Sequence, residues 1–236
     1  MTKEEIDQLY HLLRRASNIA EDSRFSGGLT PSEQISVFYG LCRHLLAGGD
    51  YQALLRFSQF YGEQFLLQPT FEAIRDAGWK PKRFVEFGAG FGWLARGLAG
   101  KFGLLPVLLV DKRPWPLIDL VEDLETEEGI DKVKACLDDG DVIVACDFLH
   151  CVELPRSIMK NFSKWPTVVL EYLPSEEELL ESFLVQITRY GASPLASRKS
   201  LQSIFEGRDT KLITLDPYVL MLVAPEGGKV DLSKHR

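Results

Sequence analysis

Residues 84–93 read Phe84-Val85-Glu86-Phe87-Gly88-Ala89-Gly90-Phe91-Gly92-Trp93, and residues 94–99 continue as Leu-Ala-Arg-Gly-Leu-Ala. An apolar strand therefore breaks into three glycines at alternate positions before a helix begins. Glycine permits positive φ and has no Cβ, and the N–H groups at the start of the helix point into the same space. Because a plain tight turn needs only one glycine, three of them indicate that a ligand approaches the backbone closely. The run predicts a strand–turn–helix unit that binds a nucleotide-like ligand.

The residues that flank the glycines distinguish two ligand classes. A dinucleotide-binding turn places a third glycine or an alanine at its sixth position, so that helix and strand pack closely. This chain has Trp93 at that position, which argues against NAD and FAD. Glu86, two residues before Gly88, offers a carboxylate to a cationic ligand group instead. The run resembles motif I of the class I S-adenosylmethionine-dependent methyltransferases, which reads acidic-x-Gly-x-Gly-x-Gly.

This resemblance implies a cofactor and a set of binding residues. In that family the glycine loop wraps the amino-acid end of S-adenosylmethionine, and the acidic residue contacts the amino group of the cofactor, usually through water. By position these roles fall on Glu86, Gly88, Gly90 and Gly92. The implied fold class is α/β: a Rossmann-like methyltransferase fold with a mainly parallel sheet and a C-terminal antiparallel hairpin.

Asp111 ends the next apolar strand, Val107 to Val110, and lies 19 residues after Gly92. An acidic side chain at this place in such folds accepts hydrogen bonds from ribose hydroxyls, and the family resemblance implies the same role. Trp115, between two prolines, is a candidate to pack on the adenine. A tryptophan of the core or of the surface is an equally good interpretation.

The segment after Asp111 departs from the family pattern. Only 29 residues separate Asp111 from Asp141, residues 117–126 have a helical pattern, and Ile130 and Val133 also follow helical spacing. A strand placed just before Asp141 would leave three residues for a parallel crossover that needs a dozen or more. We therefore expect the third strand to be missing or compressed into about residues 114–120, with atypical adenine contacts.

Two further strands end in polar residues. Asp141–Cys146 predicts a strand buried on both faces, followed by Asp147 and His150, and Thr167–Leu170 predicts the next strand, followed by Glu171. The resemblance places Asp147 beside the cofactor, on its methionine side or on the acceptor side. His150 is either a general base for an acceptor hydroxyl or a hydrogen-bonded structural residue. Glu171 either binds or orients the acceptor or belongs to the scaffold. It is also the second choice, after His150, for the general base.

Three regions are expected along the 236 residues: an all-helical N-terminal cap over 1–78, an S-adenosylmethionine-binding Rossmann-like domain over 79–225, and a flexible tail over 226–236. The net charge of −7 without a basic stripe argues against nucleic acid as a partner. No apolar run is long enough to span a membrane, and the N-terminus lacks the layout of a signal peptide, so we expect no membrane partner and a cytoplasmic location. Cysteine and histidine spacing matches no common zinc pattern, so no metal is expected.

The sequence thus predicts an enzyme that transfers a methyl group from S-adenosylmethionine to a small-molecule acceptor. His150 acts as the base where the accepting group is a hydroxyl. The alternative is a catalytically inactive, methyltransferase-like module that binds the cofactor or a partner. An NAD-dependent oxidoreductase is the third choice. Nothing in the sequence indicates the oligomeric state or the identity of the acceptor.

Overall fold

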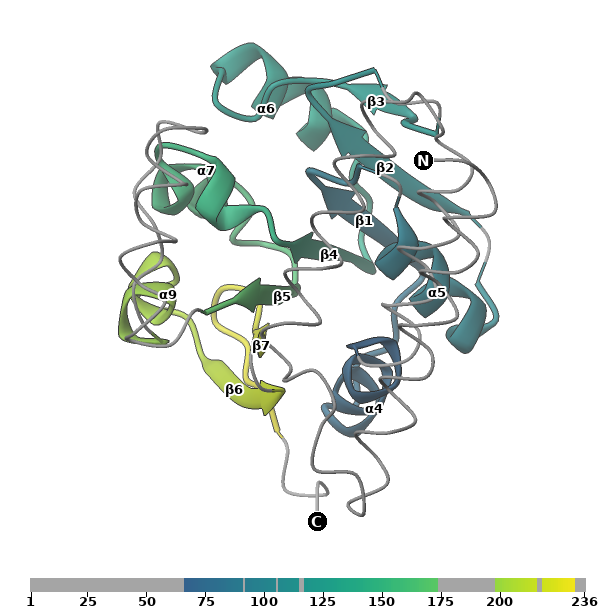
Figure 1. The fold of residues 1–236 in the computed structure, drawn as a ribbon, viewed down its shortest axis with the longest axis vertical. Coiled ribbons are helices and arrows are strands. Elements are labelled where there is room, and N and C mark those ends of the chain that lie inside the picture. The colour runs from purple at the N-terminus through teal and green to yellow at the C-terminus, as the bar shows by residue number, and fades with distance from the viewer. Residues whose placement is uncertain are drawn as a thin grey trace, which may run out of the picture. The chain divides into compact units, whose positions relative to one another are not determined.

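A computed structural model describes residues 66–90, 92–104, 106–114, 117–173, 198–215 and 218–231 of the chain (Figure 1). The strands are β1 Arg83–Phe87, β2 Val107–Asp111, β3 Leu120–Val121, β4 Asp141–Cys146, β5 Thr167–Tyr172, β6 Thr210–Leu215 and β7 Tyr218–Val223. The helices are α4 Gln68–Asp76, α5 Trp93–Phe102, α6 Glu127–Ala135, α7 Pro155–Asn161 and α9 Arg198–Ile204, together with the 3-10 turn η2 Leu149–Cys151.

The strands form one sheet in the order β3-β2-β1-β4-β5-β7-β6. Strands β1 to β5 pair in parallel, whereas β7 pairs antiparallel with both β5 and β6. The predicted mainly parallel sheet with an antiparallel C-terminal hairpin is therefore confirmed. Because β1 and β4 are the inner strands of the parallel part, their carboxyl ends open onto the crevice where such sheets bind ligands.

The third strand was expected to be either missing or compressed, and it is present as a short strand. Leu120 pairs with Val110 and Val121 with Asp111, so the strand begins at the last residue of the segment in which it was expected. The helical expectation for residues 117–126 is wrong at this point. Asp119 explains the strand, because its backbone N–H donates to the Leu109 carbonyl at 3.1 Å and its Oδ2 accepts from the Leu109 N–H at 2.9 Å. These two bonds hold the chain along the edge of β2 and override the local pattern.

The residues around Ile130 and Val133 form α6, as their spacing predicts. Thr126 begins this helix by accepting a hydrogen bond from the Gly129 N–H at 3.0 Å, and Glu127 and Glu128 occupy the first turn. A hydroxyl cap and acidic residues both stabilise a helix N-terminus. The connection from β3 to β4 is therefore a helical crossover, which parallel strands require.

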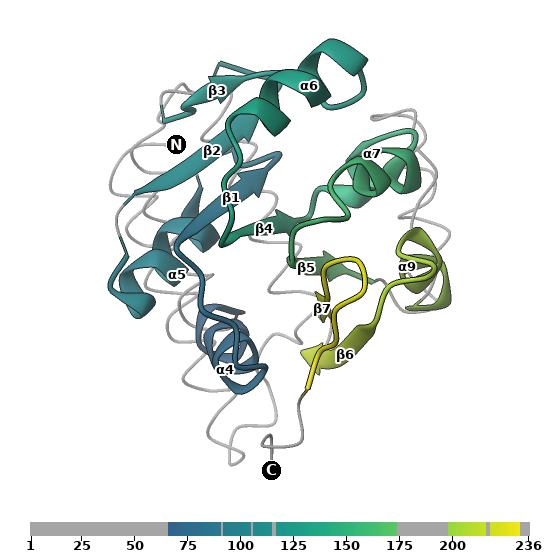
Figure 2. The same cartoon turned by 180° about the vertical axis from the view of Figure 1, so that it is seen from behind.

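Helices cover both faces of the sheet (Figures 1 and 2). Val85 and Phe87 of β1 belong to a buried core that also contains residues of α6, α7 and α9, and the Phe87 and Phe162 rings pack with centroids 4.7 Å apart. On the other face, the ring of Phe84 lies 5.6 Å from that of Phe102 in α5. Alternate residues of one strand thus serve two layers.

Within the expected all-helical cap, the last helix is present as α4, and it packs on the α/β domain. Its Phe71 ring lies 4.9 Å from that of Phe102 in α5. The other helices expected in the N-terminal cap, over residues 1–65, lie outside the described residues, so the proposed division at residue 79 stays a prediction. At the other end, Val230 is buried and its N–H donates to Asp209 Oδ2 at 2.7 Å. The tail, expected to be loose from residue 226, is therefore held at least as far as this contact.

Candidate functional site

The glycine loop has the backbone conformation that its composition predicts. Gly88, Gly90 and Gly92 have φ of 60°, 53° and 64°, which is the left-handed region. Side chains other than that of glycine rarely adopt this conformation, because the Cβ then crowds the following carbonyl. Gly92 is also the N-cap of α5, so the loop leads directly into the start of that helix.

The three glycines are nevertheless needed for different reasons. A Cβ on Gly92 would lie 2.4 Å from Leu109 in β2, and a Cβ on Gly88 would lie 2.6 Å from the Phe148 ring. A Cβ on Gly90 would meet nothing within 4 Å. The expectation that a close ligand explains all three glycines therefore needs correction. Packing accounts for Gly88 and Gly92, and Gly90 is the one of the three whose missing side chain leaves space open.

Glu86 lies beneath the start of α5 and is only 2% exposed. Its Oε2 accepts a hydrogen bond from the Ala95 N–H at 3.0 Å. Because Gly92 has no side chain to cap α5, this carboxyl satisfies one of the free N–H groups of the first turn. Burial raises the pKa of Glu86 to about 8. Its contact with a cofactor amino group stays a prediction.

Asp111 joins the glycine loop to the end of β2. Its Oδ2 accepts from the Gly90 N–H at 2.9 Å, and its Oδ1 accepts from the Arg113 N–H at 2.8 Å. A carboxylate has about four lone-pair sites, so both oxygens retain capacity for ribose hydroxyls. That role stays a prediction. Trp115, the adenine candidate, lies outside the described residues.

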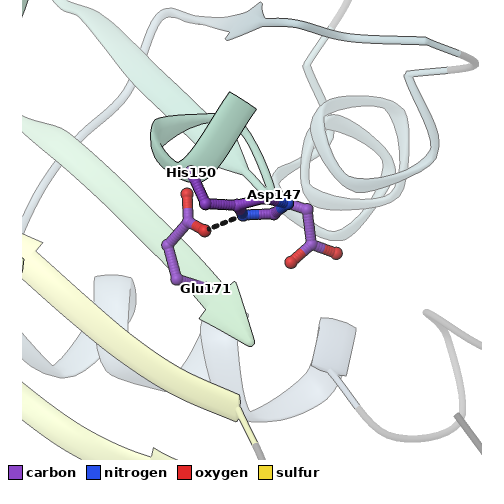
Figure 3. Close-up of side chains that lie close together, drawn as sticks. All are labelled: Asp147, His150 and Glu171. Carbon is purple, nitrogen blue, oxygen red and sulfur yellow. Dashed lines mark hydrogen bonds and ion pairs between the residues drawn. The ribbon is translucent and has the colours of Figure 1, made fainter. Parts of the chain in front are cut away.

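His150 and Glu171 meet at the carboxyl ends of β4 and β5 (Figure 3). His150 lies in η2, and its Nδ1 is 2.6 Å from Oε2 of Glu171. The other oxygen of Glu171, Oε1, accepts from the Leu149 N–H at 2.7 Å, and the side chain is fully buried. Glu171 is thus fixed at both oxygens, and it fixes the orientation of the imidazole in turn.

The charge of this pair follows from its surroundings. Burial disfavours the charged imidazolium, but the Glu171 carboxylate outweighs burial and raises the pKa of His150 well above its usual value. With Nδ1 directed at Glu171, the other ring nitrogen, Nε2, is the one that can accept a proton when the imidazole is neutral.

Asp147 completes a group of three side chains. Its carboxylate, a ring nitrogen of His150 and the Glu171 carboxylate all lie within 4.8 Å of one another. Asp147 has φ of 49°, the only positive value among the described residues other than glycine. The Tyr218 hydroxyl donates to its Oδ2 at 2.9 Å. These atom types also suit a metal ion, although a strong hydrogen bond already joins His150 and Glu171.

Sequence reasoning missed Tyr218. The residue begins β7 and was interpreted only as part of the terminal hairpin. It is 3% exposed, and its hydroxyl needs a buried partner, which is a general signal for tyrosine in an apolar strand. The partner was not predictable, because Asp147 lies 71 residues earlier in the chain. Only the placement of β7 beside β5 brings the two together.

No protein-family model and no curated protein sequence matches the chain. Solved structures of similar fold do. Human N-acetylserotonin methyltransferase, in complex with its cofactor, has a TM-score of 0.51 and 13% identity over 84% of this chain and 60% of that protein. The mitomycin 7-O-methyltransferase MmcR has a TM-score of 0.50 and 16% identity over 93% of this chain and 66% of that protein.

An O-methyltransferase family 2 protein from Planctomyces limnophilus, in complex with apigenin, has a TM-score of 0.50 and 13% identity over 72% of this chain and 60% of that protein. The chain thus spans about three fifths to two thirds of the length of these proteins. Because the sequence identities are this low, the structural similarity to these proteins shows a shared architecture alone. The chain has the Rossmann-like α/β fold of the class I S-adenosylmethionine-dependent methyltransferases.

Proposed function

We propose that this protein transfers a methyl group from S-adenosylmethionine to a hydroxyl of a small molecule, with His150 as the general base. The observation that carries the proposal is the 2.6 Å contact between His150 and Glu171 at the carboxyl edge of the sheet. This pair is next to the glycine loop, because the Phe148 ring, two residues before His150, occupies the space beside Gly88. A proton acceptor therefore lies beside the loop expected to hold the methyl donor.

The residues present fit S-adenosylmethionine. Gly90 leaves open space beside the loop, Asp111 has remaining hydrogen-bonding capacity, and Glu86 lies beneath the start of α5, the helix that follows the loop. When bound, the cofactor supplies a methyl group already activated by a sulfonium. The protein then has to hold the acceptor in line and remove a proton, and positioning supplies much of the rate.

His150 and Glu171 provide the proton transfer. Glu171 holds the Nδ1 proton of His150, so Nε2 of the neutral imidazole would accept the acceptor's hydroxyl proton. Transfer of the methyl group to that oxygen would break its bond to the sulfonium sulfur and leave S-adenosylhomocysteine. The imidazolium produced is stabilised by the Glu171 carboxylate. The raised pKa of His150 limits the neutral fraction at neutral pH. The reaction should therefore accelerate as pH rises.

Two other functions are disfavoured. An inactive binding module would have no need for the buried, doubly bonded Glu171. An NAD-dependent oxidoreductase would be expected to have the parallel 3-2-1-4-5-6 sheet, whereas here the antiparallel β7 lies between β5 and β6.

The acceptor class and the location are also proposals. The names of two proteins of similar fold specify N-acetylserotonin and mitomycin, which are small molecules. The net charge of −7 disfavours nucleic acid. No helix of the described part is long and apolar enough to cross a membrane. Cys136, Cys146 and Cys151 are free thiols, in agreement with a cytoplasmic location.

Calorimetric titration with S-adenosylmethionine and S-adenosylhomocysteine tests the cofactor, and we expect both to bind. Absence of binding at millimolar ligand would contradict the proposal. A methyl-transfer assay over hydroxylated small molecules, with wild type and His150→Gln in parallel, then tests the chemistry. Transfer that His150→Gln leaves unchanged would contradict the role of His150 as base.

A further inference from the structure

The contact between Asp147 and Tyr218 has no part in the proposed proton transfer, and it decides where the Asp147 carboxylate points. Asp147 follows β4, and its N–H donates to the Leu170 carbonyl of β5 at 2.9 Å. Tyr218 belongs to β7, on the far side of β5 from β4, and donates to Oδ2 of Asp147 at 2.9 Å. A phenol from β7 thus reaches past the end of β5 to hold this carboxylate.

The direction of this contact separates two roles for Asp147. The sheet order runs β1-β4-β5-β7, and the glycine loop follows β1. The carboxylate of Asp147 is therefore drawn toward β7, away from the side on which the loop would hold the cofactor. One of its ligand atoms still lies within 4.8 Å of ligand atoms of His150 and Glu171. Figure 3 shows the imidazole between the two carboxyl groups.

The backbone supports the same interpretation. The positive φ of Asp147 is unfavourable for a residue with a Cβ, and such strain persists where surrounding contacts impose it. Here a strand hydrogen bond and the Tyr218 hydroxyl impose it. Tyr218 is buried, so its hydroxyl is a fixed donor rather than a mobile surface group. Asp147 is partly exposed, and a carboxylate offers about four lone-pair sites in all.

Two hydrogen-bond acceptors so close together select the shape of the ligand. A carboxylate oxygen of Asp147 and a ring nitrogen of His150 lie within 4.8 Å. With ordinary hydrogen-bond lengths, one molecule with two neighbouring donors reaches both, whereas donors at opposite ends of a ring do not. We propose that Asp147, held by Tyr218, is an acceptor-binding carboxylate that selects molecules with a second hydroxyl or amino group adjacent to the methylated hydroxyl. This proposal rests on the proposed methyl transfer at the same site.

Its test compares catechol, which has two adjacent hydroxyls, with phenol, which has one. Their dissociation constants are measured by ligand-observed NMR on protein saturated with S-adenosylhomocysteine, in buffer that contains EDTA. We expect wild type to bind catechol about tenfold more tightly than phenol, as one hydrogen bond to a charged group would give. Asp147→Asn should lose most of this preference, because it removes the charge that strengthens the hydrogen bond. Tyr218→Phe should retain only part of the preference, because it frees Asp147 without removing its charge.

Calorimetry with S-adenosylhomocysteine on the same variants serves as the control. Unchanged cofactor affinity in Asp147→Asn, with the catechol preference lost, supports the proposal. Equal binding of catechol and phenol by wild type, or no binding of either, overturns it. So does an Asp147→Asn protein that loses cofactor affinity but keeps the preference, since Asp147 would then face the cofactor.

Two further outcomes are distinguishable from these. A preference that appears only without EDTA would assign recognition to a cation held by the three side chains and would overturn the proposal. If wild type fails to bind S-adenosylhomocysteine at all, the proposed function itself fails, whatever the ratio of catechol to phenol. Circular dichroism on each variant establishes that the fold is retained, and Tyr218→Phe provides a conservative second variant if Asp147→Asn does not fold.

Discussion

Nδ1 of His150 lies 2.6 Å from Oε2 of Glu171, although the two residues are 21 positions apart in the chain. The contact exists because β4 and β5 are adjacent parallel strands whose carboxyl ends meet at one edge of the sheet. Glu171 is fully buried, so its carboxylate interacts with the imidazole in surroundings that screen charge poorly. This geometry determines the expected behaviour of the site in solution.

Replacement of His150 by Gln should lower the rate of methyl transfer to a hydroxyl by about 10²- to 10⁴-fold, the usual contribution of a positioned base. Affinity for S-adenosylhomocysteine should not change, because the cofactor is expected at the glycine loop. Single-turnover rates and calorimetry measure the two effects separately. A parallel loss of cofactor affinity would show that His150 belongs to the cofactor site instead.

Replacement of Glu171 by Gln should lower the pKa of His150, because the carboxylate makes the largest of the contributions that raise it. NMR titration of the His150 ring resonances, assigned with His150→Gln, measures this shift directly. Glu153→Gln, at an exposed carboxylate, is the matched control and should leave the pKa unchanged. A pKa that does not move in Glu171→Gln would contradict the ion pair.

The rate of methyl transfer should rise with pH through the pKa of His150, since only the neutral imidazole accepts a proton. In wild type this rise is expected above the ordinary histidine range, because the pKa is raised. In Glu171→Gln the rise should shift to lower pH, with a lower maximum because the imidazolium is less stabilised. The pH dependence of kcat measures both. A flat profile across the pKa found by NMR would argue against base catalysis by His150.

Gly90→Ala and Gly92→Ala should have different effects although both glycines have positive φ. Each substitution introduces backbone strain of about 1–2 kcal/mol. Gly92→Ala also pushes a methyl group against buried Leu109, which should destabilise the protein by about a further 1–3 kcal/mol. Gly90→Ala meets no protein atom and should mainly weaken cofactor binding. Urea unfolding and calorimetry measure the two effects, and equal losses of stability would contradict this assignment.

Glu86 should make the protein less stable as pH rises. Its pKa is about 8 in the folded protein against about 4.5 for an ordinary glutamate in the unfolded chain, so between these values the folded state binds a proton that the unfolded state lacks. The contribution of Glu86 to the free energy of unfolding is complete below about pH 4.5. Between about pH 4.5 and pH 8 it decreases by up to about 1.4 kcal/mol per pH unit. Urea unfolding of wild type and Glu86→Gln at several pH values tests this, and the variant should have the smaller slope.

Local sequence determined the parts of this protein that depend on neighbouring residues. Alternating glycines in the stretch from Gly88 to Gly92 require a turn that other residues cannot adopt, and continuous apolar runs produce buried strands such as β4. Polar residues placed directly after such strands identified Asp111, His150 and Glu171 as site candidates. The crossover length between Asp111 and Asp141 correctly left room for only a short third strand.

Tertiary structure decided what depends on strands distant in the chain. The position of Leu120–Val121 in the sheet follows from Asp119 bonding to Leu109 across the edge, which no helical periodicity reveals. The packing reasons for Gly88 and Gly92 depend on Phe148 and Leu109, and the Tyr218 contact with Asp147 depends on the antiparallel placement of β7. Sequence periodicity indicates which face of a strand is buried. Which residues contact one another across the sheet depends on the order and register of the strands within it.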